Sequence, residues 1–157
     1  MSDWPLRPRV ESNLLNPALI GMLIAHGATG YASERGEALP WPMAFLIPPL
    51  VLHRPTRDQL PKNVRTHFAA WVGRQSTLMI GYPKRAEVMV EPTREGLRMA
   101  LRSQRMQIQD GRLVATALTT APAGELRQLL ASATVVGRLF ARLDQPSTAF
   151  ALMGVAP

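Results

Sequence analysis

Residues 91–117 constrain the fold most strongly, because they predict a short basic helix that leads directly into a tight β-hairpin. Pro92 suits the first position of a helix, and Thr93 can cap the helix start with its side chain. Further along, Asp110-Gly111 separates two short apolar runs, and this dipeptide favours the positive φ angles of a two-residue hairpin turn. A basic helix followed by a hairpin predicts a winged helix.

The predicted helix has one apolar face and one cationic face. At about 100° per residue, Leu97, Ala100 and Leu101 fall on the same side. The cationic residues are Arg94, Arg98, Arg102 and Arg105, on an adjoining stripe about 80° wide, and Arg112 on the hairpin. Such a row can replace counterions on the phosphates of nucleic acid. It can also lie in solvent or against a protein, which is the commoner state of a charged helix face.

The positive charge of the chain is concentrated in its middle part. The chain has 18 Lys or Arg, 11 Asp or Glu and a net charge of +7. Residues 54–112 hold 12 of the basic and 5 of the acidic residues, which already gives +7, and the remaining 6 and 6 cancel. This polarised charge favours an acidic partner, either nucleic acid or a negatively charged protein surface.

Length and composition predict a single, mainly α-helical domain with a small β-hairpin. A chain of 157 residues with 46% hydrophobic content can bury one core and is too short for two ordinary domains. We expect an extended arm at residues 1–12 and a compact domain at 13–157, with a winged helix-turn-helix at about 82–117. Trp4 in the arm either anchors it to a partner or folds back on its own domain.

Proline and glycine positions predict the other helix boundaries. Asn16 and Pro17 suit a helix start, and the apolar spacing that follows continues to about Tyr31, with Gly27 and Gly30 at the fraying end. Further helices are expected at residues 62–74, 82–90 and 125–143, with a break at 91–93, and a short hydrophobic helix is expected from Pro42 until Pro48-Pro49 kinks or ends it. Trp41 and Trp71 are expected in the core.

The sequence predicts a protein that is not an enzyme. It has no P-loop, dinucleotide-binding glycine pattern, GxSxG or HExxH motif. It has no cysteine, and His26, His53 and His67 lack metal-ligand spacing, so we expect neither a metal nor another cofactor. Only convergence of His53 and His67 with a carboxylate would favour catalysis. The most apolar run, at 40–52, is shorter than the roughly 20 residues of a membrane span, and no secretion signal is present, so we expect a cytoplasmic protein.

Several short motifs follow one another along almost all of the chain after residue 13. They are Asn16-Pro17-Ala18, Leu39-Pro40, Leu50-Val51-Leu52-His53, Arg57 with Leu60-Pro61, Trp71, Arg85-Ala86, Thr93-Arg94-Glu95 with Leu97, Gly137 with Phe140-Ala141, and Gly154-Val155 with Pro157. In this order they resemble the middle component of the three-component ABC ATPase systems of bacteria. Leu139 departs from the pattern, since an aromatic residue is expected next to Phe140, and this affects local packing only.

The resemblance implies a winged helix-turn-helix adaptor that has no catalysis of its own and acts in defence against invading genetic elements. Its partners would be an ABC-type ATPase and a C-terminal effector component, which it would link. The polarised charge and the helix-hairpin unit add DNA as a further candidate partner, contacted through the five arginines. Two other interpretations stay open. A free-standing winged-helix transcription regulator would form a symmetric dimer on its own promoter. A purely structural subunit would place the same arginines against an acidic surface of the ATPase.

Overall fold

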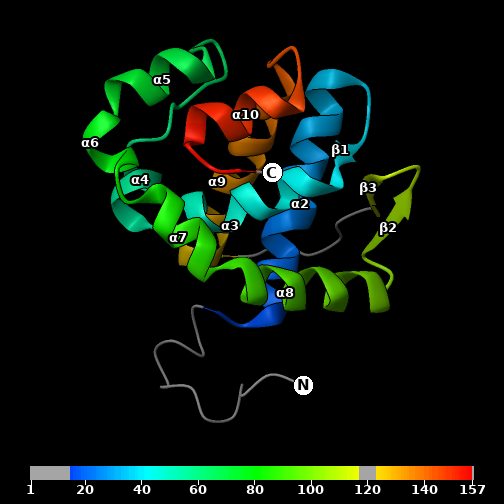
Figure 1. Ribbon diagram of the computed structural model, residues 1–157. Coiled ribbons are helices and arrows are strands. Elements are labelled where there is room, and N and C mark those ends of the chain that lie inside the picture. The colour runs from blue at the N-terminus through cyan, green and yellow to red at the C-terminus, as the bar shows by residue number, and fades with distance from the viewer. Residues whose placement is uncertain (1–14, 117–122, 157) are drawn as a thin grey trace.

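The computed structural model describes residues 15–116 and 123–156, so the predicted arm at 1–12, with Trp4, lies outside the described residues (Figure 1). The elements are α2 (Pro17–Arg35), β1 (Leu39–Pro40), the 3-10 helix η2 (Trp41–Leu46), α3 (Ile47–Val51), α4 (Arg54–Asp58), α5 (Phe68–Arg74), α6 (Ser76–Met79), α7 (Tyr82–Val88), α8 (Val90–Arg102), β2 (Met106–Gln109), β3 (Arg112–Ala115), α9 (Gly124–Ala141) and α10 (Pro146–Met153). The prediction of a mainly helical fold with a small hairpin is confirmed.

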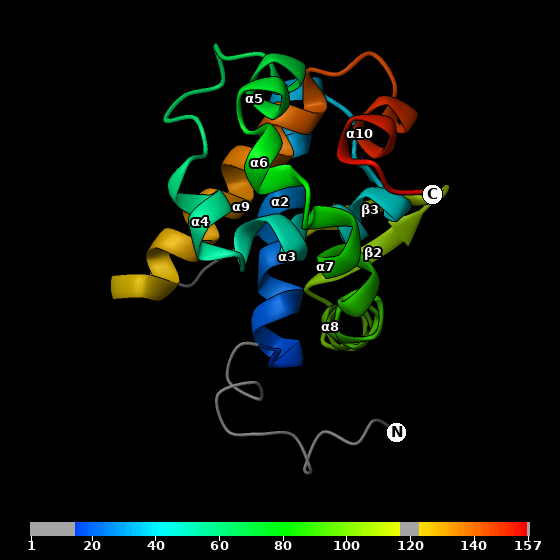
Figure 2. The same ribbon diagram turned by 60° about the vertical axis from the view of Figure 1, so that its left-hand side comes forward.

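Helix α2 lies at the centre of the molecule, between α9 on one side and α8 on the other (Figures 1 and 2). Its start agrees with the sequence, because the Asn16 side chain accepts a hydrogen bond from the amide of Ala18 at 2.8 Å and Pro17 occupies the first helical position. Its buried residues include Ile20, Leu23 and Ile24, which are fully covered by the surrounding helices. The apolar spacing in this segment was therefore a sound guide to the core.

Glycines bring the backbone of α2 into contact with both of its neighbours. A Cβ atom added to Gly137 of α9 would overlap the carbonyl group of Gly27 in α2. A Cβ atom added to Gly21 of α2 would lie 2.8 Å from the carbonyl oxygen of Gly96 in α8. Because interiors are close-packed, neither contact leaves room for a side chain.

The expectation that Gly27 and Gly30 mark the end of the first helix is wrong. The helix continues to Arg35 and ends at Gly36, which has the left-handed φ of 77° typical of a helix C-terminus. Gly27 and Gly30 are buried against α9 instead. Glycine weakens a helix locally, and here that cost is offset by the packing of two helices at backbone distance.

The predicted hairpin is present and belongs to a three-stranded antiparallel sheet of order β1-β3-β2. Asp110 and Gly111 at its turn have φ angles of 52° and 74°, as a type I′ turn requires. The third strand, β1, was not predicted and places Leu39 opposite Leu113. The hairpin is therefore attached along one edge to the segment that follows α2.

The boundary between α7 and α8 differs from the predicted break at residues 91–93. Only Met89 separates the two helices, and Pro92 and Thr93 lie inside the first turn of α8, where proline is tolerated because the amide it lacks has no partner there. Thr93 does not cap the helix, because it lies inside α8 and its buried hydroxyl forms no hydrogen bond with the described residues. A one-residue joint is shorter than the usual turn of three or four residues in a helix-turn-helix, and the winged-helix assignment is not confirmed.

The short helix expected from Pro42 is present as η2, which ends at Leu46, and Pro48 and Pro49 lie in the first turn of α3, because proline suits the start of a helix. Two other expectations are corrected. The helix expected at 62–74 begins only at Phe68. Trp71 is buried as expected, but Trp41 is 47% exposed and does not belong to the core.

The contact between Gly27 and Gly137 predicts an unusual response to alanine. Gly137→Ala should lower the free energy of unfolding by about 1–3 kcal/mol, because the new methyl group meets the backbone of α2. The control is Gly73→Ala in α5, where an added Cβ has no neighbour within 4 Å and alanine should be neutral or stabilising by up to about 1 kcal/mol. Urea unfolding followed by circular dichroism measures both, and equal midpoints would contradict the packing argument.

The two buried threonines should respond in opposite ways to valine. The hydroxyl of Thr93 has no hydrogen-bond partner among the described residues, so Thr93→Val should raise the free energy of unfolding by about 1 kcal/mol. Thr56 is equally buried, but its hydroxyl oxygen lies 2.7 Å from Nδ1 of His53, so Thr56→Val should lower the stability by about 1–2 kcal/mol. Thermal unfolding of the two variants beside the wild type tests the difference in sign.

Candidate protein-interaction surface

The predicted cationic stripe lies on the outer face of α8. Arg94, Arg98 and Arg102 are exposed, while Leu97 and Ala100 on the opposite side are buried. This arrangement follows from the periodicity of the helix, since residues four apart lie on one side and the apolar set packs on α2. Arg102 also lies in the last turn, where a cation interacts favourably with the negative end of the helix dipole.

Arg105 follows the helix and does not belong to the helical stripe on which it was predicted. The helix ends in a Schellman motif, in which Gln104 has a φ of 60° and the amide of Arg105 donates to the carbonyl oxygen of Ala100 at 2.9 Å. The Arg105 side chain is exposed and borders a small hollow of about 290 Å³ that Met22 and Met99 also line. The row of arginines therefore does not continue along the helix axis beyond Arg102, because the backbone changes direction at Gln104, before Arg105.

The five predicted arginines are not equally available to a partner. Arg94 forms an ion pair with Glu91 one turn earlier on α8. Arg112 is half-buried, and its guanidinium group donates to the carbonyl oxygen of Ala38 at 2.8 Å, so it stabilises the sheet. In the part of the chain that the structure describes, Arg98, Arg102 and Arg105 form no ion pair; we call these three residues the arginine ridge.

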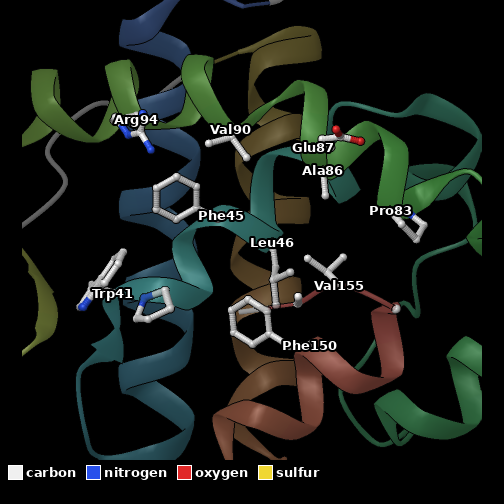
Figure 3. Close-up of a pocket in the computed structure, with 13 residues that line it drawn as sticks. Trp41, Phe45, Leu46, Pro83, Ala86, Glu87, Val90, Arg94, Phe150 and Val155 are labelled. Atoms are coloured by element: carbon white, nitrogen blue, oxygen red, sulfur yellow. The ribbon is translucent and has the colours of Figure 1, made fainter.

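An apolar groove that the sequence did not predict lies along one flank of α8 (Figure 3). It has a volume of about 590 Å³ and is formed by η2, α7, the start of α8, and the end of α10 with the residues that follow it. Its lining residues are Trp41, Pro42, Phe45, Leu46, Pro83, Ala86, Glu87, Val90, Arg94, Phe150, Gly154, Val155 and Ala156. The groove therefore brings together three stretches that are far apart in the sequence, at 41–46, 83–94 and 150–156.

Trp41 and Phe45 form an aromatic wall of the groove. Their rings pack edge to face, with centroids 6.2 Å apart and an interplanar angle of 79°. The backbone amide of Trp41 donates to the carbonyl oxygen of Gly111 at 3.1 Å, which joins the start of η2 to the hairpin turn. Trp41 was expected in the core, but it lies between Pro40 and Pro42 at the very start of η2, where its side chain is 47% exposed.

Buried hydrogen bonds hold the other walls in place. The hydroxyl of Tyr82, at the start of α7, donates to the carbonyl oxygen of Leu46 at 2.8 Å, and burial raises the pKa of this hydroxyl far above its usual range. At the end of α10, Gly154 has a left-handed φ of 70°, and the amide of Val155 donates to the carbonyl oxygen of Phe150 at 3.0 Å. This turn brings Val155 back against the groove (Figure 3).

Charged side chains of the groove lie toward its two ends. Figure 3 shows Arg94 next to Phe45, on the same side of the groove as Trp41, and Glu87 next to Ala86 toward the other end. Between the two charges the walls are apolar. From one end to the other, the groove thus presents the cation Arg94, apolar walls and the carboxylate of Glu87. Arg94 lies on the same helix as Arg98 and Arg102 and so connects the groove to the arginine ridge.

The histidines occupy unrelated positions. His53 shares a hydrogen bond with Thr56, and Arg85 donates to the same threonine oxygen at 3.4 Å. His67 precedes α5, and residues 15–116 and 123–156 contain no group of three His, Asp or Glu side chains that could hold a metal ion. No helix among the described residues is long and apolar enough to cross a membrane.

The lowered pKa values of His26 and His53 predict that the protein loses stability in mild acid. Burial lowers the pKa of His26, and burial together with the nearby charge of Arg85 lowers the pKa of His53. As the pH falls below about 6.5, the unfolded chain binds these protons first, so the free energy of unfolding should decrease from pH 7.5 to pH 5.5. The double variant His26→Gln, His53→Gln should have a flatter profile in urea titrations, and an unchanged slope would contradict the assignment.

Comparison with known protein families gives one match. The family model described as ABC-three component (ABC-3C) system Middle Component 3 matches residues 4–157, and so includes α2 to α10 and all residues of the arginine ridge and the apolar groove. No curated protein and no solved structure matches the chain significantly.

Proposed function

The chain belongs to the ABC-three component (ABC-3C) system Middle Component 3 family, and we propose that it is a non-catalytic adaptor that links the ABC-type ATPase of such a system to the C-terminal component. A middle component of a multi-component system implies protein partners, and the resemblance of the sequence motifs supports a role between these two. In this proposal the protein acts in the cytoplasm, in defence against invading genetic elements, and contributes binding surfaces instead of a reaction.

The arginine ridge is the observation that carries the proposal. Arg98, Arg102 and Arg105 are exposed, lie close together along the chain and have no ion-pair partner among the described residues. Arginine binds carboxylates through two parallel hydrogen bonds and is easier to remove from water than lysine, so it suits an acidic protein surface. The ridge is also carried by a helix and a defined turn, which keep its geometry fixed before a partner arrives.

The number of available arginines favours a protein over DNA as the partner of the ridge. Neutralising one phosphate of duplex DNA changes the slope of log affinity against log salt by about 0.9. Three arginines would therefore give a slope of about 2.7, well below that of proteins that make roughly 6–10 phosphate contacts. Arg112 already donates to the carbonyl oxygen of Ala38, and adding Arg94, which shares its guanidinium group with Glu91, would raise the slope only to about 3.6. DNA contact remains a secondary property in this proposal.

A charge reversal on the ridge tests the proposal. Arg98→Glu combined with Arg102→Glu should weaken binding to the partner component at least about tenfold, because two carboxylates would face an acidic surface. The matched control is Arg127→Glu with Arg142→Glu, which changes the net charge equally at two exposed positions on and just after α9. Isothermal titration against the purified ATPase and C-terminal component, each alone, measures the affinities.

The same proteins distinguish the competing interpretations. Failure of the wild type to bind either component would overturn the adaptor, and equal losses in both double variants would overturn the role of the ridge. A symmetric dimer with sequence-specific footprints would favour a transcription regulator. Binding to DNA with a salt slope well above 2.7, abolished by the ridge variant, would make DNA the primary partner.

A further inference from the structure

We propose that the apolar groove binds a short segment of a partner protein in which a large apolar side chain is followed or preceded by an aspartate or glutamate. This inference rests on the proposed adaptor function and names the chemistry that one partner would use. The arginine ridge gives a general attraction to an acidic surface, whereas the groove can select a particular sequence, because it has both shape and fixed charges.

The size and composition of the groove fit an apolar side chain. Its volume of about 590 Å³ is that of a typical ligand site, and its middle is lined by Leu46, Val90 and Phe150. Trp41 is 47% exposed although it packs on Phe45, so a large area of its ring remains in water. Covering such a tryptophan with a complementary side chain supplies a large share of the energy at many interfaces.

The charges of Arg94 and Glu87 indicate which kind of residue can lie beside the bound apolar side chain. Arg94 at the aromatic end uses one nitrogen, Nη1, for its ion pair with Glu91, and the rest of the planar guanidinium group can receive a second carboxylate. Glu87 toward the other end lies 3.4 Å from Nζ of Lys84 and repels a second acidic group there. A bound segment is therefore expected to place its carboxylate at Arg94 and its apolar side chain between the two charges.

These features disfavour nucleic acid as the occupant. Arg94 is the single cation in the described lining, and Glu87 would repel a phosphate backbone. The experiment below also detects a second copy of the same chain in the groove, and that result would overturn the proposal. The groove is adjacent to the arginine ridge on α8, so one acidic partner can engage both surfaces at once.

Site-specific cross-linking of the full chain tests the occupant directly. A photoreactive p-benzoylphenylalanine placed at Trp41 should cross-link, in the complex with the two other components, to one segment containing a large apolar residue beside Asp or Glu. The control position is Ile80, which is 80% exposed, follows α6 and does not line the groove. Mass spectrometry identifies the linked peptides. Cross-links to a second copy of the chain, or none beyond the Ile80 level in an intact complex, would overturn the proposal.

A pair of valine variants gives an independent measurement without a probe. Val90→Asp adds a carboxylate inside the groove and should lower the affinity for the cross-linked component at least tenfold. Val88→Asp adds the same group at a side chain that is 62% exposed and outside the groove, and should leave the affinity unchanged. Both variants are first compared with the wild type by thermal unfolding.

The outcomes separate this inference from the adaptor proposal. If the components bind the wild-type chain, and the ridge variant lowers their affinity but Val90→Asp does not, the groove proposal fails and the adaptor proposal stands. If neither component binds the wild-type chain, both proposals fail together. If Arg94→Glu weakens binding and a Lys substituted for the acidic residue of the cross-linked segment restores it, the predicted orientation in the groove is supported.

Discussion

The backbone contacts of α2 with α9 and α8 determine where every other feature lies. Gly27 against Gly137 fixes the first pair of helices, and Gly21 against Gly96 fixes the second. Because the second contact turns the small-residue face of α8 toward α2, its arginines have to face outward. The same contact leaves Val90 and Arg94 on a flank, where η2 and α10 complete the groove. Both proposed binding surfaces thus follow from the absence of side chains at a few buried positions.

Local chemistry made much of this fold predictable. Asn16 caps α2 and Asp110-Gly111 forms the hairpin turn, because both features depend on a few adjacent residues. The role of Gly27 could not be predicted in the same way, since a glycine that ends a helix and one that admits another helix look alike in sequence. What distinguishes them here is Gly137, more than a hundred residues further along the chain.

Helical spacing predicted the exposure of some of the five arginines and missed the contacts of the others. Arg98 and Arg102 are exposed as their helical spacing indicated, but the hydrogen bond of Arg112 to Ala38 depends on β1, a strand too short to be recognised from its two residues. Gln104 adopts a left-handed conformation more typical of glycine, so the helix end before Arg105 carried no clear signal. The groove depends on three distant stretches of the chain, and periodicity within any one of them contains no information about it.

The link between Trp41 and the hairpin turn has a consequence for how such proteins diverge. The hydrogen bond to Gly111 comes from the backbone amide at position 41, while the indole ring points to the groove. Any residue except proline can supply that amide. A substitution at position 41 can therefore change the aromatic wall of the groove while the backbone hydrogen bond that joins η2 to the hairpin turn is kept.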